Sequence, residues 1–252
     1  LLHLIDASER AGETMNMGKL DGSDFIYVAR LPAHRMNVAA ALIGRRQPAY
    51  CASGGRAIMS QMPQSEVEAL LAAARNASPQ VELFVLLGVT RGLRRGEICG
   101  LWWDDVDFEK GDLRITHNLI QSSTYSTDRV LVTELVRKDP KSLTSHRTLT
   151  LSPELERVFT RVKTQQARDR LKSPERWPHE AYVFAAKNGR PIWPRNMARS
   201  FRRFIENEDL PNISPHDLRR TFANTTSQAG APIEQISEAL GHASIGITKS
   251  LY

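Results

Sequence analysis

The chain has 252 residues and a formal net charge of +6, with 34 Lys and Arg against 28 Asp and Glu. This length is enough for one large or two modest domains, and the two cysteines, Cys51 and Cys99, exclude a disulfide framework and a four-cysteine zinc site. No segment approaches the roughly 18–20 consecutive apolar residues of a membrane span, and the N-terminus lacks the pattern of a secretion signal, so we expect a cytoplasmic protein with no membrane partner.

The first part of the chain differs in pattern from the rest. Residues 1–47 contain two helix-like stretches, Leu1–Ala11 and Met36–Arg46, separated by a polar region. Residues 48–61 contain Pro, Ser and Gly without apolar periodicity, which is typical of a linker. The sequence therefore predicts a small helical N-terminal domain, a linker, and a second domain over residues 62–252.

The second domain begins with helical patterns. Ser65 and Glu68 resemble a capping box that opens the first helix. The next segment, Val81–Val89, is almost continuously apolar and predicts a buried helix. A third helix follows Arg94 and stops at Asp104.

The apolar period then changes from that of helices to that of strands. Val106–Phe108 and Leu113–Thr116 flank a Glu-Lys-Gly-Asp turn, which predicts a hairpin, and Val130–Val136 and Arg147–Leu151 predict two further strands. After Ser152 the pattern is helical. The predicted fold class is mainly α with a small antiparallel β-sheet (α+β).

Arginines cluster at 91–95, 195–203 and 219–220, each time beside apolar residues at helical spacing. A solvated basic surface would explain the mild excess of positive charge alone. The clustering favours helices that present guanidinium groups to a polyanion such as nucleic acid.

Two segments in the first half of this domain contain candidate functional groups. Arg94 and Glu97 lie three residues apart, so on a helix the carboxylate can orient the guanidinium, although a surface ion pair has the same spacing. Lys141 lies in Asp139–Ser142, between two predicted strands, where a lysine on a hairpin tip can reach a phosphate or donate a proton. A solvated lysine is the simpler alternative there.

Two further segments lie near the C-terminus. His216 and Arg219 share one helical face and combine a proton-transferring group with a phosphate-binding group, though a polar helix face would look the same. Gly241 can end a helix and leave His242 in a loop where it can contact a ligand. Tyr252 follows ten residues later.

Two arginines, a lysine, two histidines and a tyrosine fit one reaction together, the attack of a phenolate on a phosphodiester. The transition state gains negative charge, which guanidinium groups neutralise. A proton donor assists the leaving oxygen, and a base assists the tyrosine, whose unperturbed pKa is about 10. No acidic triad for magnesium stands out, so the sequence predicts no metal and no other cofactor.

The order of these segments resembles the tyrosine recombinase, or phage integrase, family of site-specific recombinases. Gly92–Glu97 resembles its first arginine box, Pro140–Thr148 its lysine hairpin, Pro215–Arg219 its His-x-x-Arg box, and Leu240–Tyr252 its nucleophile segment. The resemblance covers residues 62–252. It implies a DNA strand transferase that cuts and rejoins DNA without metal or ATP, in DNA integration or movement of a mobile genetic element.

Carried over to this chain, the resemblance implies a role for each matched residue. Tyr252 would be the nucleophile that forms a 3′-phosphotyrosyl link, and Arg94 and Arg219 would clamp the scissile phosphate. Lys141 would be the general acid and His216 an acid/base partner.

The remaining expected roles are supporting ones. His242 would donate a hydrogen bond to the phosphate, and Glu97 would hold the active-site arginines or His216. Arg91 stands where the family usually has Thr or Ser, and the Gly-Leu-Arg spacing favours Arg94 as the site arginine. Contacts to the DNA backbone are predicted for Arg147, Arg195, Arg202 and Arg203.

The resemblance also implies an assembly. In the family, four protomers act on two double-stranded DNA sites and exchange strands through a Holliday junction, so we expect a homotetramer associated with the nucleoid. Residues 1–47 would be a partial helical core-binding domain that closes around DNA. Family members continue past the nucleophile with a helix that docks on a neighbouring protomer, whereas this sequence stops at Tyr252.

Three alternatives remain open at this point. A type IB topoisomerase shares the catalytic logic but relaxes supercoils without partner sites. An inert DNA-binding module would be indifferent to substitution of Tyr252, and a helical protein-interaction domain would show no salt-dependent DNA affinity. The sequence does not reveal the DNA target or the biological task.

Overall fold

The computed structural model forms two compact units, Leu1–Gln61 and Met62–Tyr252. The residues that it describes are 5, 15–21, 24–31, 43–48, 63–125, 131–138, 146–172, 177 and 182–241. The division between the units falls at the end of the predicted linker, almost all of which lies outside the described residues.

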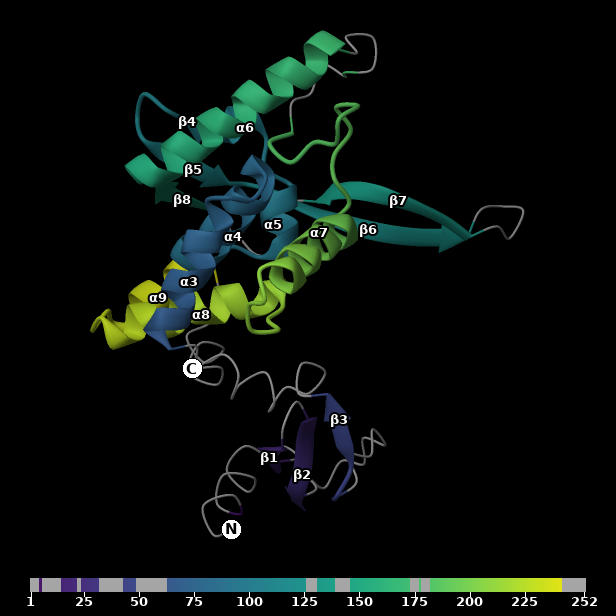
Figure 1. The fold of residues 1–252 in the computed structure, drawn as a ribbon, viewed down its shortest axis with the longest axis vertical. Helices are drawn as coiled ribbons and strands as arrows, with labels where there is room; N and C mark the ends of the chain where they lie inside the picture. Colours follow the sequence, from purple (N-terminus) through teal and green to yellow (C-terminus); the bar gives the residue numbers. More distant parts are fainter. Residues whose placement is uncertain are drawn as a thin grey trace. The chain divides into compact units, whose positions relative to one another are not determined.

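The described part of the N-terminal unit is a three-stranded antiparallel sheet in the order β1-β2-β3 (Figure 1). Its strands are β1 (Met15–Asp21), β2 (Asp24–Leu31) and β3 (Arg46–Pro48). Phe25 of β2 is buried, and its ring meets Tyr27 edge-on with 5.1 Å between the centroids. This small apolar contact stabilises the sheet.

The sequence pattern did not predict these strands. The last part of the predicted helix Met36–Arg46 is wrong, because residues 43 and 44 form a turn and Arg46 begins β3. The rest of that helix and nearly all of Leu1–Ala11 lie outside the described residues, so they stay predictions, as does a DNA-clamping role for this unit.

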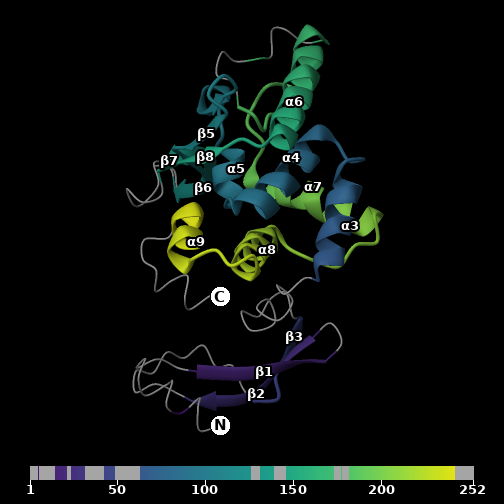
Figure 2. The ribbon, with the colours of Figure 1, turned by 90° about the vertical axis from the view of Figure 1, so that its left-hand side faces the viewer.

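The second unit is mainly helical, as predicted (Figures 1 and 2). Its helices are α3 (Gln64–Ala74), α4 (Pro79–Arg91), α5 (Arg95–Cys99), the 3₁₀ helix η2 (Trp103–Asp105), α6 (Pro153–Lys172), α7 (Pro194–Asn207), α8 (Pro215–Gln228) and α9 (Ile233–Leu240). Helix α4 contacts α3, α6, α7 and α8. The capping box predicted at Ser65 is wrong, since α3 begins at Gln64, after Pro63.

Helix α4 lies at the centre of this unit because its sequence is apolar on all sides. Phe84 is fully buried, and its ring centroid lies 6.4 Å from that of Phe184 and 5.7 Å from that of Phe201. One charged residue interrupts the apolar run: Glu82 is fully buried and forms an ion pair with Arg161 of α6. The helix therefore joins the core by apolar packing and by a buried charge.

Two small sheets complete the second unit. Strands β4 (Val106–Asp107), β5 (Asp112–Ile115) and β8 (Arg147–Thr150) form one sheet in the order β4-β5-β8, and β6 (Asn118–Tyr125) and β7 (Leu131–Lys138) form the other. The β6–β7 ribbon projects away from the helices in Figure 1. The predicted β4–β5 hairpin is confirmed, whereas β6 was missed.

The strand pairing corrects the expected setting of Lys141. Strand β7 pairs with β6, and β8 pairs with β5, so the strands on either side of Lys141 do not form a hairpin with each other. Lys141 therefore belongs to a connection between two sheets, and residues 139–145 lie outside the described part of the chain. This connection begins after Lys138, which pairs with Asn118 at the base of the ribbon.

Candidate active site

The site begins with a sharp turn after α4. Gly92 ends the helix in the left-handed conformation, with φ of 62°. A Cβ atom there would lie 2.5 Å from Phe222 and 2.7 Å from Leu240, so both the backbone angle and the space require glycine. The turn buries Leu93 and places Arg94 at the residue before α5.

Glu97 fixes the position of Arg94. Its carboxylate accepts hydrogen bonds from the backbone N–H of Arg94, at 2.9 Å, and from Nη1 of the same residue, at 2.7 Å. Burial acts to raise the pKa of Glu97, but the guanidinium groups of Arg147 and Arg94 outweigh it and hold this pKa below its usual value. Glu97 is therefore an anion that orients Arg94, which is the contact expected from the spacing.

Arg147 is the second partner of this carboxylate, at 2.9 Å from Nη2 to Oε2. Its side chain is only 6% exposed. The guanidinium is buried against Glu97 and joins β8 to α5 behind the site. A contact between Arg147 and DNA stays a prediction.

Arg219 is almost completely buried on α8 and connects two helix ends. It donates hydrogen bonds to the carbonyl oxygens of Gly92, at 2.6 Å, and Leu240, at 2.7 Å. Arg94 donates from Nη2 to the next carbonyl, that of Gly241, at 3.3 Å. The C-terminal end of a helix attracts cations, so the end of α9 draws both guanidinium groups together.

The first turn of α8 places a histidine beside these arginines. Pro215 begins the helix, as predicted, and the Asp217 carboxylate accepts hydrogen bonds from the backbone N–H of Ser214, at 2.8 Å, and from its hydroxyl, at 2.6 Å. These bonds fix the start of the helix. His216 and Arg219 then lie one turn apart on the face that meets Arg94.

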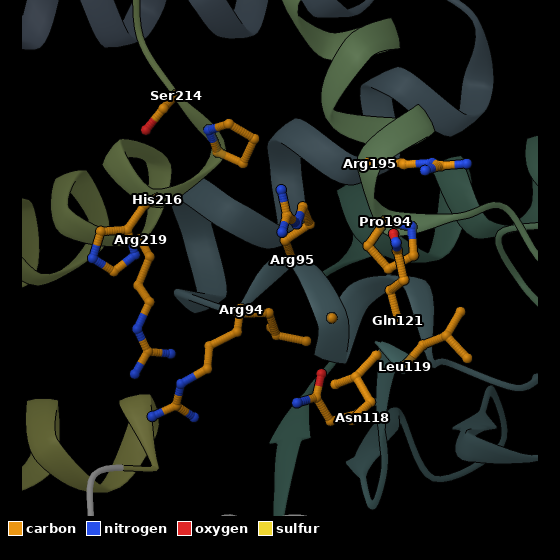
Figure 3. Close-up of a pocket in the computed structure, with 14 residues that line it drawn as sticks. Arg94, Arg95, Asn118, Leu119, Gln121, Pro194, Arg195, Ser214, His216 and Arg219 are labelled. Atoms are coloured by element: carbon orange, nitrogen blue, oxygen red, sulfur yellow. The ribbon is translucent and has the colours of Figure 1, made fainter. Parts of the chain in front are cut away.

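A cavity of about 610 Å³ connects these side chains (Figure 3). Its lining residues are Leu93, Arg94, Arg95, Gly96, Asn118, Leu119, Ile120, Gln121, Pro194, Arg195, Ser214, Pro215, His216 and Arg219. Four guanidinium groups and an imidazole line it, and none of these lining residues carries a carboxylate. Such a cavity suits an anion.

Other residues singled out in the sequence fall outside this cavity. Arg91 donates from Nε to the carbonyl oxygen of Thr150 at 3.1 Å and does not line the cavity, whereas Arg94 and Arg95 of the first box do. Arg202 and Arg203 are exposed on α7 away from the lining. The candidates outside the described residues are Lys141, His242 and Tyr252.

Among the lining residues that were not identified from the sequence are one arginine and two amides. Arg95 lies within the first arginine box, in which the site role was assigned to its neighbour Arg94. Asn118 and Gln121 lie on β6, a strand that was not predicted from the sequence pattern. A search for polar side chains beside a basic motif would have found Arg95, but not the two amides.

The close approach of α5 and β6 gives a testable prediction. A Cβ atom on Gly96 would overlap the Asn118 side chain and lie 2.9 Å from the carbonyl oxygen of Leu119. Where nothing obstructs, Gly-to-Ala in a helix stabilises by roughly 0.5–1 kcal/mol. We expect Gly96→Ala to lower the free energy of unfolding by about 1–3 kcal/mol instead, measured by urea denaturation. A gain in stability would show that Asn118 and Leu119 of β6 can move to make room for the added methyl group.

Two negative findings apply to the described residues alone. No group of three or more His, Cys, Asp or Glu side chains among them is placed to hold a metal ion. None of the helices described is long and apolar enough to cross a membrane.

Comparison with known proteins gives the family. The model of the phage integrase family matches residues 60–252. The chain belongs to the phage integrase family. Residues 2–80 match a second family model, bacterial transcriptional regulator IclR C-terminal, which covers the smaller part of the chain and overlaps the integrase match over residues 60–80.

Relatives within the integrase family are distant in sequence. A tyrosine recombinase XerC-like protein of Caldanaerobacter subterraneus subsp. tengcongensis is 28% identical over 176 residues, 69% of this chain and 45% of that protein. An integrase of Streptomyces ambofaciens is 28% identical over 193 residues, 75% of this chain and 47% of that protein. The chain thus spans about half the length of the curated relatives it matches.

A solved structure confirms the predicted fold of the integrase part. The Tn1549 transposon integrase in complex with circular intermediate DNA has a TM-score of 0.60 and 21% identity, with 76% of this chain and 61% of that chain covered. The fold is that of tyrosine recombinase catalytic domains, mainly α with small antiparallel sheets.

Proposed function

We propose that residues 62–252 are the catalytic domain of a site-specific DNA recombinase, which cuts and rejoins DNA strands. The observation that carries the proposal is the convergence of Arg94, His216 and Arg219 in one cavity lined by cations. Paired guanidinium groups placed in advance around a phosphodiester stabilise the charge that develops as it is attacked. Relatives named tyrosine recombinase and integrase, one of them solved with DNA, support the same chemistry.

The reaction is a transesterification that conserves the number of phosphodiester bonds. The phenolic oxygen of Tyr252 attacks the scissile phosphorus, and the bond to the 5′ oxygen breaks as the 3′-phosphotyrosyl bond forms. Lys141 gives a proton to the leaving oxygen, and His216 accepts the proton of the tyrosine and returns it in the reverse step. His242 donates a hydrogen bond to a non-bridging oxygen.

The connectivity of the chain supports these roles for residues outside the described part. His242 directly follows Gly241, whose carbonyl oxygen accepts a hydrogen bond from one of the clamp arginines. Lys141 follows three residues after Lys138, which pairs with the cavity-lining residue Asn118. His242 and Lys141 therefore each follow, within three residues, a described residue that contacts the site or pairs with one of its lining residues.

The family pattern extends the proposal to an assembly. Four copies of the protein would bind two double-stranded DNA sites, associated with the nucleoid, and exchange strands in two steps through a Holliday junction. Because the phosphotyrosyl bond retains the energy of the original phosphodiester, this cycle consumes no ATP.

The test compares wild-type protein with Tyr252→Phe on nicked suicide duplexes. The duplexes would be enriched from a random library for binding to Tyr252→Phe, incubated in EDTA and separated on a denaturing gel. We expect a slowly migrating covalent adduct with wild type and none with Tyr252→Phe. Tyr182→Phe is the matched control, since Tyr182 packs against Trp102 away from the cavity and should keep the adduct.

Each other outcome points to a named alternative. No adduct from DNA-bound wild type would overturn the catalytic assignment and leave an inert DNA-binding module. An adduct accompanied by relaxation of supercoils on DNA with a single site would favour a topoisomerase instead.

A further inference from the structure

The cavity contains more positive charge than one phosphate requires. In Figure 3, Arg94, His216 and Arg219 lie on one side, and Pro194, Arg195 and Gln121 lie on the other, with Arg95 between them in this view. The proposed function uses the first side only. Two guanidinium groups that line the same cavity, those of Arg95 and Arg195, have no part in that chemistry, and for Arg195 the sequence predicted only a contact with the DNA backbone at no particular phosphate.

These two arginines differ in their partners from the arginines of the unit that pair with a buried carboxylate. Arg94, Arg147 and Arg161 each pair with a buried carboxylate. Arg95 and Arg195 are exposed, and neither forms an ion pair with a carboxylate among the described residues. Since a concave surface concentrates the field of such charges, they attract an anion to this side of the cavity.

The backbone around Arg195 adds to this attraction. Arg195 lies in the first turn of α7, after Pro194 begins the helix, and that turn carries no acidic residue. The positive end of the helix dipole is therefore not neutralised locally. The guanidinium of Arg195 lies 4.9 Å from the ring of Trp193, which restricts its motion while leaving its edge able to donate hydrogen bonds.

We propose that Arg95 and Arg195 form a second phosphate site, which holds the DNA backbone phosphate adjacent to the scissile phosphate on the same strand. The inference rests on the proposed function. A cavity of about 610 Å³ is the size that holds one small ligand, so a second anion in it is the neighbour of the first along one strand. Holding two successive phosphates fixes the direction of the strand, and with it which oxygen leaves.

The test combines charge removal on the protein with charge removal on the DNA. Arg95→Gln and Arg195→Gln should each weaken binding of unmodified DNA about tenfold, as expected for a charge-assisted hydrogen bond, and reduce the salt slope by about 0.9. Arg170→Gln is the control, because it removes the same charge from the exposed end of α6, away from the cavity. It should leave affinity and the rate of adduct formation unchanged.

The DNA arm replaces one phosphate at a time with a neutral methylphosphonate on each side of the scissile position. At one of the two positions, wild type should lose about tenfold in affinity, while Arg95→Gln and Arg195→Gln lose little more than they have already lost. If the losses of affinity from the arginine substitution and from the methylphosphonate multiply at both positions, the proposed second phosphate site is overturned. Because wild type must still form its adduct on unmodified DNA, failure of this inference is distinct from failure of the proposed function.

Discussion

Replacing Glu97 with glutamine should lower the free energy of unfolding by about 3–5 kcal/mol, because the change leaves two neighbouring guanidinium groups without their shared anion. Glu97 is 3% exposed, and Arg147 on its far side is 6% exposed, so water replaces little of the lost interaction. Urea denaturation at pH 7 measures the effect. Glu206→Gln is the control, since Glu206 is exposed on α7 and its replacement should change stability by less than about 0.5 kcal/mol.

The effect of Glu97 should depend on pH in a definite direction. Its folded-state pKa is held below that of the unfolded chain, which is about 4.3, so the ionised carboxylate stabilises the protein above that pH. The contribution is lost as pH falls through the lower folded pKa. The stability difference between wild type and Glu97→Gln should therefore shrink from pH 7 towards pH 3, and a constant difference would contradict the assigned ionisation.

A second buried glutamate, Glu82, shows that the exposure of the partner arginines decides whether the pKa of a buried glutamate is raised or lowered. Glu82 is also fully buried and also faces two arginines, yet burial raises its pKa and the attraction of Arg161 and Arg157 does not compensate. The side chains of those arginines are 39% and 51% exposed, so water screens them. At Glu97 one of the two partners, Arg147, is itself buried at 2.9 Å, and its attraction holds the pKa of Glu97 below the usual value.

Most of the helical framework followed from local sequence pattern, because the apolar run of α4 and the proline or glycine at helix ends act over a few residues. Strand β6 did not, since Asn118, Gln121 and the two serines interrupt its strand-favouring residues and its conformation depends on pairing with β7. The hairpin predicted around Lys141 was wrong for the same reason. The two strands that flank Lys141 are neighbours in the sequence, but β7 pairs with β6 and β8 pairs with β5, and this pairing depends on contacts between residues far apart in the sequence.

The residues of the candidate site also fall into those that local motifs predicted and those that depend on tertiary packing. Arg94, Glu97, His216 and Arg219 were identified because short motifs gave their spacing. The buried ion pair of Arg147 with Glu97 was not predicted, since a basic residue on a short strand gives no sign that a buried carboxylate lies behind it. Burial of charge is set by tertiary packing, which a local pattern does not contain.

Replacing Arg94 and Arg219 by glutamine, one at a time, should reduce activity in both cases but should lower the stability of the protein by different amounts. Both substitutions should reduce the rate of adduct formation at least 100-fold, the usual loss when one preorganised donor to a developing charge is removed. Arg94 is 39% exposed, and Glu97 keeps Arg147 when it is lost, so Arg94→Gln should lower the free energy of unfolding by no more than about 1 kcal/mol.

Arg219→Gln should cost about 3 kcal/mol or more in addition to activity, because it removes two charge-assisted hydrogen bonds that connect the ends of α4 and α9. Arg220→Gln is the matched control: Arg220 is the next residue on α8 and is also buried, but its Nε and Nη1 atoms have no hydrogen-bond partner. Equal stability losses for Arg94→Gln and Arg219→Gln would contradict this division. If it holds, the hydrogen bonds of Arg219 to Gly92 and Leu240 both stabilise the fold and set the position of the guanidinium proposed to bind phosphate.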